Sequence, residues 1–147
     1  PQCNSTDQYP KAHYDPAQQI KPGRMKNILI PSGENTPEIS ENAQSASFIV
    51  SGASAPDNPV AFFSQVNEKM EAFVARTTGP KIIRFDLVYF NSSSAKFIYL
   101  MLKKLNSVDS VKVEWVYEEG DTDILESGQD YQKLSGLDFD FVVKPAQ

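Results

Sequence analysis

Hydrophobic and polar residues alternate with two different periods along the chain, and the change of period marks the elements that the sequence predicts. Short apolar runs at residues 27–30 and 47–51 predict two strands. Residues 36–39 are predicted to be extended, because Pro37 disfavours helix at the residue before it. We expect the two strands to pair with each other as a hairpin with a polar connection.

Apolar residues at helical spacing predict helices in three places. The first covers residues 57–78, where six large apolar side chains share one face. The second starts at a run of serines after Asn91 and extends to about residue 106. The third is predicted over residues 122–133, in a polar and acidic part of the chain.

Strands are predicted between these helices and after the last one. Residues 81–90 are nearly continuously apolar, which indicates a central strand covered on both faces. Residues 111–117 alternate, which places Trp115 and Tyr117 on one apolar face, and residues 137–143 form the final strand. Strand–helix alternation implies right-handed crossovers, so the predicted fold class is α/β: a single domain with a mixed, mostly parallel sheet and helices packed on it.

Two charged residues interrupt the apolar strand over residues 81–90. Arg84 and Asp86 share the strand face opposite Phe85 and Leu87. We expect them to pair with each other or with a helix covering that face, and we assign them no chemistry.

Composition divides the chain into two parts. Residues 1–24 contain four prolines and few aliphatic residues, so they are predicted to be a disordered tail or an expression remnant, with Met25 as a possible native start. Residues 25–147 are predicted to form the folded domain. The tail lacks the pattern of a signal peptide, and no apolar run is long enough to span a membrane. The lone cysteine, Cys3, indicates a reducing compartment, so a cytoplasmic location is expected.

The same counts exclude several kinds of chemistry. His13 is the only histidine, and neither His nor Cys follows Arg24, which removes Ser-His-Asp and Cys-His catalysis from the folded part. So few soft ligands nearly exclude a zinc site, and we expect no metal and no cofactor. With 14 basic and 19 acidic residues the net charge is −5, which disfavours nucleic acid as a partner.

The run from Asn91 to Ser94 is the main candidate site. It joins the end of a predicted central strand to the start of a helix, where backbone N–H groups are unpaired and carry partial positive charge. Capping needs one or two hydroxyl groups, yet Ser92, Ser93 and Ser94 are all present. The alternatives are redundant capping or a helix start that binds an anion or is phosphorylated.

A second candidate is the acidic segment from Glu114 to Asp140, which holds nine acids and a single base, Lys133. Carboxylates at this density could bind a divalent cation, although they do not match the EF-hand loop. A solvated acidic surface is the simpler interpretation. Such a surface would also suit a basic partner.

Several stretches together resemble one known family, the SiaC-type bacterial regulatory phosphoproteins. Their order and spacing carry the resemblance, which extends from about Met25 to Val143. The matching stretches are Ile30–Ile39, Tyr89–Lys96, Trp115–Asp121 and Glu126–Tyr131.

The resemblance implies a fold similar to STAS domains and a non-enzymatic role in a partner-switching circuit. In such a circuit, the unphosphorylated protein binds and activates a diguanylate cyclase in cyclic-di-GMP signalling. A dedicated serine/threonine kinase phosphorylates it, and a metal-dependent (PP2C-like) phosphatase reverses the modification.

The hydroxyl that follows the motif asparagine is implied to accept the phosphate, and here it belongs to Ser92, with Ser93 and Ser94 as competing acceptors. Asn91, Ser93, Ser94 and Lys96 are the implied partner-binding residues, and the free protein is expected to be a monomer. Relatives usually have threonine at the position of Ser92.

A second departure from the family pattern lies in the loop after the strand at residues 47–51. Ala55 replaces an aromatic residue that relatives have at this position.

Three other functions compete with this interpretation. The chain could antagonise an anti-sigma factor, or it could be a constitutive adaptor that is never phosphorylated. A small hydrolase is the enzymatic alternative, and it would have to take its general base from Asp or Glu.

Overall fold

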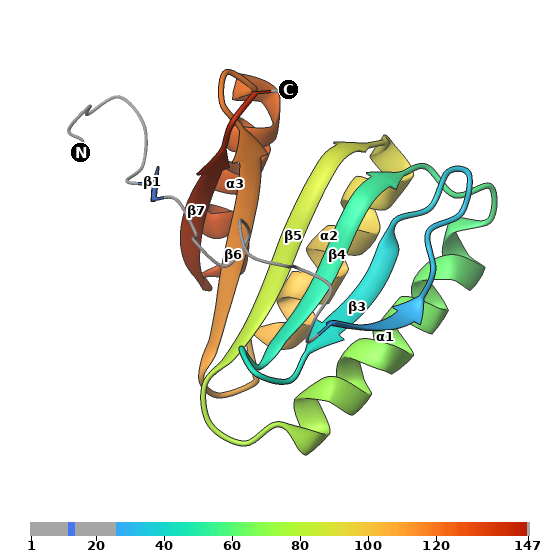
Figure 1. The fold of residues 1–147 in the computed structure, drawn as a ribbon, viewed down its shortest axis with the longest axis vertical. Helices are drawn as coiled ribbons and strands as arrows, with labels where there is room; N and C mark the ends of the chain where they lie inside the picture. The colour runs from blue at the N-terminus through green and yellow to red at the C-terminus, as the bar shows by residue number, and fades with distance from the viewer. Residues whose placement is uncertain (1–11, 14–25, 147) are drawn as a thin grey trace.

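The structure is a computed structural model that describes the backbone of residues 12–13 and residues 26–146. Over these residues the chain forms seven strands and three helices (Figure 1). The elements in chain order are β1 (Ala12–His13), β2 (Lys26–Ile30), β3 (Glu38–Asn42), β4 (Ser47–Ser54), α1 (Pro59–Arg76), β5 (Lys81–Phe90), α2 (Ser92–Leu105), β6 (Val111–Glu118), α3 (Thr122–Ser135) and β7 (Asp138–Lys144).

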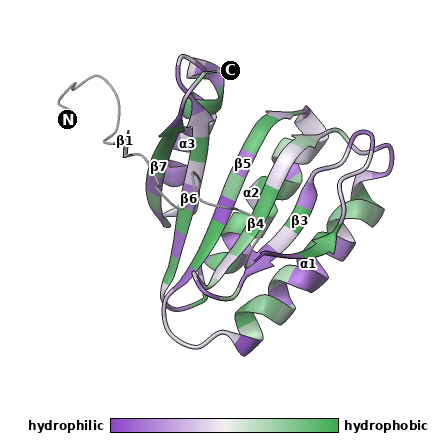
Figure 2. Cartoon of the chain, viewed as in Figure 1, coloured by the Kyte–Doolittle hydropathy of each residue, from purple (hydrophilic) through white to green (hydrophobic). Residues whose placement is uncertain are grey.

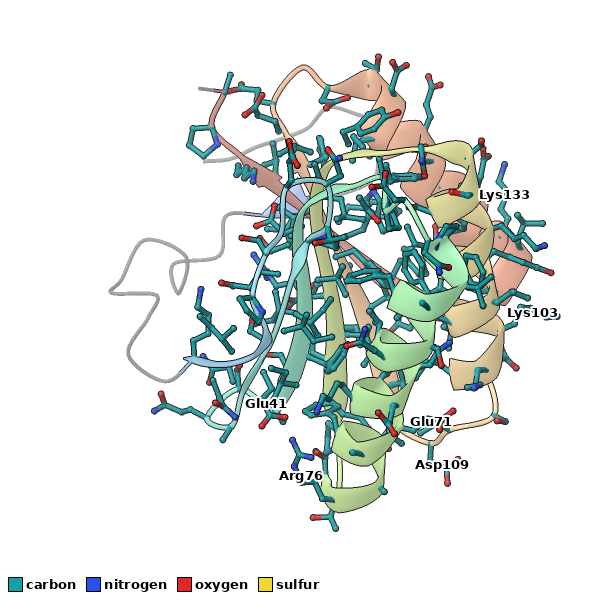
Figure 3. The ribbon with its side chains drawn as sticks, turned by 90° about the vertical axis from the view of Figure 1, so that its right-hand side faces the viewer. Glu41, Glu71, Arg76, Lys103, Asp109 and Lys133 are labelled. Carbon is teal, nitrogen blue, oxygen red and sulfur yellow. The ribbon has the colours of Figure 1, made fainter. Side chains whose placement is uncertain are left out.

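The described strands form one mixed sheet in the order β1-β7-β6-β5-β4-β3-β2. Strands β4, β5, β6, β7 and β1 are parallel to one another, whereas β3 pairs antiparallel with both β2 and β4. The helices α1, α2 and α3 each connect two neighbouring parallel strands, and all three lie on the same face of the sheet (Figures 1 and 3). This arrangement confirms the predicted α/β class with a mostly parallel sheet.

The predicted hairpin between the first two strands is wrong. Strand β3 lies between β2 and β4 and pairs with both of them, through Ile28↔Ser40 on one side and Ser40↔Ile49 on the other. The segment predicted only as extended therefore supplies a full strand. Of its side chains, Ile39 faces the core with 0% exposure.

The prediction that β5 is covered on both faces is also wrong, because no described helix lies over the second face. Arg84 and Asp86 occupy that face, and both form ion pairs with other strands of the sheet. Arg84 forms an ion pair with Glu114 of β6, and Lys144 of β7 lies 2.7 Å from the Asp86 carboxylate. Cross-strand ion pairs thus satisfy the charges that interrupt the apolar strand.

The hydrophobic core lies between the sheet and the three helices. Figure 2 shows hydrophobic residues along much of β5, next to hydrophilic positions that belong to the opposite face. Trp115 is 1% exposed, which confirms its predicted place in the core, and its indole Nε1 donates a hydrogen bond of 2.8 Å to the Ile124 carbonyl. Tyr117 packs at the border of the same core.

The predicted tail over residues 1–24 lies, apart from the backbone of Ala12–His13, outside the residues that the structure describes. Within those that it describes, none of the helices has the length and apolar character that crossing a membrane requires.

Tyr131 of α3 links the core to the start of α2. Its ring packs against Trp115 and Phe90, with centroid distances of 5.5 Å and 6.4 Å, and its hydroxyl donates a 2.8 Å hydrogen bond to the Ala95 carbonyl. Burial raises the pKa of the Tyr131 phenol from 10.0 to about 12. The folded state therefore favours the neutral phenol.

This pKa shift predicts a loss of stability at high pH. The contribution of Tyr131 is fully present below pH 10.0, the unfolded value, and is lost as the pH rises towards about 12, because only the unfolded phenol ionises in that window. Urea unfolding should show wild type losing about 1 kcal/mol more than Tyr131→Phe between neutral pH and pH 11. Equal losses in the two proteins would contradict the prediction.

Candidate functional site

A β-bulge in β5 changes the direction of the side chains just before α2. Gly52 of β4 pairs with Leu87 and Ala53 pairs with Tyr89, so Val88 is an extra residue in β5. Leu87 is 3% exposed, whereas Val88 and Tyr89 are 57% and 54% exposed. Bulges occur beside functional sites because they redirect side chains. Here the bulge exposes two consecutive apolar residues close to the candidate site.

The side chain of Asn91 caps α2, as the sequence predicts for this run. Its Oδ1 accepts hydrogen bonds from the backbone N–H of Ser94 at 2.9 Å and from the Ser93 hydroxyl at 3.1 Å. The backbone N–H of Asn91 donates to the Ser54 carbonyl at the end of β4, at 3.0 Å. Asn91 is therefore fixed by both its side chain and its backbone.

Ser94 is buried beneath the helix start, with 0% exposure. Its hydroxyl donates to the Ser54 carbonyl at 3.0 Å and lies 2.8 Å from the Ser54 hydroxyl. A serine hydroxyl has one proton, so Ser54 must donate in the second contact. Ser94 therefore joins α2 to β4, and neither a kinase nor a partner can reach it in this conformation.

Ser92 differs from the other two serines. It is the first residue of α2, it is exposed, and its hydroxyl forms no hydrogen bond with any residue that the structure describes. Ser93 is half-buried and its hydroxyl is bonded to the cap. Of the three candidate acceptors, Ser92 is thus the one with an accessible and unengaged hydroxyl.

The outer face of α2 continues the surface that starts at Ser92. Lys96, Leu100 and Lys103 follow it at spacings of four, four and three residues, and all are exposed. Leu100 is 45% exposed and adds apolar area between the two lysines. Figure 3 shows Lys103 on the outer side of the helical layer. We call Ser92, Lys96, Leu100 and Lys103 the α2 ridge.

The start of α2 carries no acidic residue in its first turn, while Lys103 and Lys104 occupy its last turn. No carboxylate in the first turn of α2 therefore neutralises the partial positive charge at its N-terminus. The C-terminal lysines match the opposite end of the helix dipole, and Lys104 additionally pairs with Glu71 of α1. An anion at Ser92 would thus meet a favourable field within α2.

The acidic segment lies mainly in β6, α3 and the loop between them. Asp121 caps α3, with its Oδ1 accepting from the Ile124 backbone N–H at 3.1 Å. Glu114 pairs with Arg84 across the sheet. No group of three acids, His or Cys within the described residues is arranged to hold a metal ion.

Two features of the site were beyond the sequence analysis. The β5 bulge, with its exposed Val88 and Tyr89, has no local signal, because both residues continue an apolar run. Ser54 was likewise missed as the residue that anchors both Asn91 and Ser94. Its place in the stretch Gly52–Asn58, which resembles a family loop, was the only available indication.

The cap predicts a measurable stability effect. Replacing Asn91 by alanine removes the acceptor for the Ser94 N–H and should cost about 1 kcal/mol of unfolding free energy. Asn91→Asp keeps an acceptor oxygen and should stay near wild type. Thermal unfolding of the two variants measures the difference. A similar loss in both variants would show that the cap hydrogen bond is not the cause.

The described residues form an α/β domain with the exposed Ser92 hydroxyl at a helix start, near the exposed Tyr89 and along the α2 ridge. The chain belongs to the SiaC family: the family described as "SiaC family regulatory phosphoprotein" matches residues 30–144. This match confirms the resemblance on which the sequence-based expectations rest.

Solved structures agree with the family match. The chain is similar to the activator SiaC in the crystal structure of the diguanylate cyclase SiaD with SiaC from Pseudomonas aeruginosa, with a TM-score of 0.70 and 25% identity over 78% of this chain and 98% of that one. It is also similar to SiaC of Pseudomonas aeruginosa, with a TM-score of 0.66 and 26% identity over 81% and 98% of the two chains.

A curated relative extends these similarities to a further sequence. It is an uncharacterised protein of Pseudomonas aeruginosa strain UCBPP-PA14, 26% identical over 119 residues, which are 78% of this chain and 94% of the relative. Nearly the whole length of these relatives therefore corresponds to one continuous part of this chain.

Proposed function

We propose that this chain is a non-enzymatic regulatory phosphoprotein whose unphosphorylated form binds and activates a diguanylate cyclase. Phosphorylation of Ser92 by a dedicated kinase releases the cyclase, and a PP2C-like phosphatase restores binding. The single observation that carries the site assignment is the contrast between the three serines: Ser92 is exposed and unengaged, whereas Ser93 is bonded to the cap and Ser94 is buried.

The family match and the SiaC of the SiaD complex support the choice of partner. The α2 ridge supports the location of the interface, because an exposed leucine between two lysines offers apolar area and charge on one helix face. We propose that this ridge, together with Ser93, contacts the cyclase. Asn91 and Ser94 act indirectly by holding the start of α2 in place.

Phosphorylation can switch such an interface without unfolding the domain. A phosphate adds about −1.5 to −2 charges at neutral pH. The N-terminus of α2 tolerates this charge, since the helix dipole favours anions there. A partner that buries the ridge would have to desolvate the phosphate, which costs binding free energy. Lys96, one turn after Ser92, would also lie close enough to pair with the phosphate and be less available to the partner.

The test is a binding and activity assay with a purified diguanylate cyclase from the same organism. Wild type should raise the rate of cyclic-di-GMP formation, and Lys96→Glu should weaken binding at least fivefold while leaving the unfolding midpoint within about one degree of wild type. Lys133→Glu on α3 is the matched control, because Lys133 is exposed but lies off the ridge. Equal effects of the two variants, or no activation by wild type, would contradict the proposal.

A further inference from the structure

An apolar pocket lies between β6, β7 and the first turn of α3, at the same edge of the sheet as Ser92. Its volume is about 270 Å³, and its lining residues are Tyr117, Glu119, Gly120, Asp121, Thr122, Leu125 and Val143. This volume is just below the usual range of small-molecule sites, which is roughly 300–1,000 Å³. The size therefore suits one large side chain better than a nucleotide or another cofactor.

The wall of the pocket is held rigidly by the loop between β6 and α3. The backbone N–H of Glu119 donates to the Lys144 carbonyl at 2.8 Å, and that of Asp121 donates to the Glu118 carbonyl at 2.9 Å. Gly120 has a φ of 90°, which favours glycine and makes this tight turn possible. These hydrogen bonds hold the backbone of the loop in place, so the wall of the pocket forms without a bound ligand.

The charged side chains that line the pocket, Glu119 and Asp121, are both acidic. Glu119 is exposed at the loop, and the Asp121 carboxylate is fixed by its hydrogen bond to the Ile124 N–H. From residue 118 to residue 132 the sequence contains no Lys or Arg. The nearest base along β7, Lys144, has its ammonium group 2.7 Å from the Asp86 carboxylate. No basic side chain of the loop itself therefore balances the two carboxylates.

We propose that this pocket binds the side chain of an arginine presented by a protein partner. The apolar part of the lining, Leu125 and Val143, can cover the aliphatic stem of an arginine. Glu119 and Asp121, which also line the pocket, offer carboxylate oxygens to the guanidinium group. Arginine suits this set better than lysine, because its planar fork of five N–H donors can bind two carboxylates at once.

The position of the pocket connects it with the proposed interface. Strands β5 and β6 are parallel neighbours, so the α2 start after β5 and the α3 start after β6 lie at the same edge of the sheet, at the top of Figure 1. One partner could therefore contact Ser92 and fill the pocket at the same time. The inference rests on the proposed function only for the existence of a protein partner.

The test is an NMR titration of the full ¹⁵N-labelled chain with N-acetyl-arginine amide. We expect saturable shifts of the amides of Gly120, Thr122 and Leu125, with an affinity in the millimolar range. The uncharged isostere N-acetyl-citrulline amide should bind at least fivefold more weakly, and so should the lysine derivative. Equal binding of citrulline would overturn the role of charge, and equal binding of lysine would overturn the choice of arginine.

Variants of the lining acids separate the pocket from the acidic surface in general. Glu119→Gln and Asp121→Asn should each weaken arginine binding at least threefold, and Asn at position 121 still caps α3. Asp123→Asn and Glu126→Gln remove exposed acids outside the lining and should leave binding unchanged. Equal losses in all four variants, or shifts that never saturate, would overturn the proposal. No cyclase is needed here, so this inference and the proposed function can fail independently.

Discussion

Installing phosphoserine at position 92 is expected to lower the affinity of this chain for the proposed partner, a diguanylate cyclase, at least tenfold. The phosphate would stand at the exposed first residue of α2, where the partner would have to strip its water on binding. A penalty of about 1.4 kcal/mol already gives a tenfold change, and desolvating an unpaired charge can cost several times more. The unfolding midpoint should stay at or above that of wild type, because the helix N-terminus stabilises an anion.

Substitutions extend this test without a kinase. Ser92→Ala should bind the cyclase as wild type does and resist phosphorylation, whereas Ser92→Asp should bind more weakly, although less so than phosphoserine because it carries about one charge. Ser127→Asp on α3 is a control for added charge elsewhere. Isothermal titration gives the affinities, and phosphopeptide mapping after kinase treatment gives the site. A phosphate found on Ser93 or Ser94 and absent from Ser92 would falsify the assignment.

Gly128→Ala is expected to destabilise the domain by about 1–3 kcal/mol. A Cβ atom at position 128 would lie 2.4 Å from Cδ1 and 2.5 Å from Nε1 of Trp115, which is far closer than carbon atoms approach in proteins. Trp115 cannot move away easily, because it is 1% exposed and its indole is bonded to the Ile124 carbonyl. Overpacking therefore outweighs the gain of about 1 kcal/mol that alanine normally brings to a helix.

A double-mutant cycle identifies the cause of this loss. In a Trp115→Ala background all the ring atoms that meet the new Cβ are gone, so Gly128→Ala should cost at least 1 kcal/mol less than in wild type. Urea unfolding of the four proteins measures the coupling free energy. If Gly128→Ala costs the same in both backgrounds, the contact with Trp115 does not cause the destabilisation.

The long amphipathic and apolar segments were predictable because each has a strong local period. The helix predicted over residues 57–78 is α1 at Pro59–Arg76, and the strand predicted over residues 81–90 is β5 with the same bounds. The short strand β3 was not predicted as a strand. Its core face carries Ile39 and Glu41, so the segment contains a single apolar residue and has no alternating pattern that would predict a strand. Pairing with β2 and β4 decides its structure.

The expectation that β5 is covered on both faces failed for a different reason. An apolar run indicated cover on both faces of β5, but Arg84 and Asp86 already marked one face as different. Their partners, Glu114 and Lys144, come from strands that lie 30 and 58 residues away along the chain. Only the parallel order β5-β6-β7 brings these charges together, so no local pattern could identify the pairs.

At the candidate site, the local residue types were enough to predict that a helix starts after Asn91 and that three hydroxyl groups gather there. Helix capping is local, so residue types within four positions are enough to specify it. Which hydroxyl is free was decided by the tertiary structure alone. Ser94 is buried because Ser54, 40 residues earlier, meets it at the end of β4, and the bulge in β5 sets the position of the helix start. Contacts between distant segments depend on which strands lie next to each other in the sheet, and the local period of one segment does not specify its partner strand.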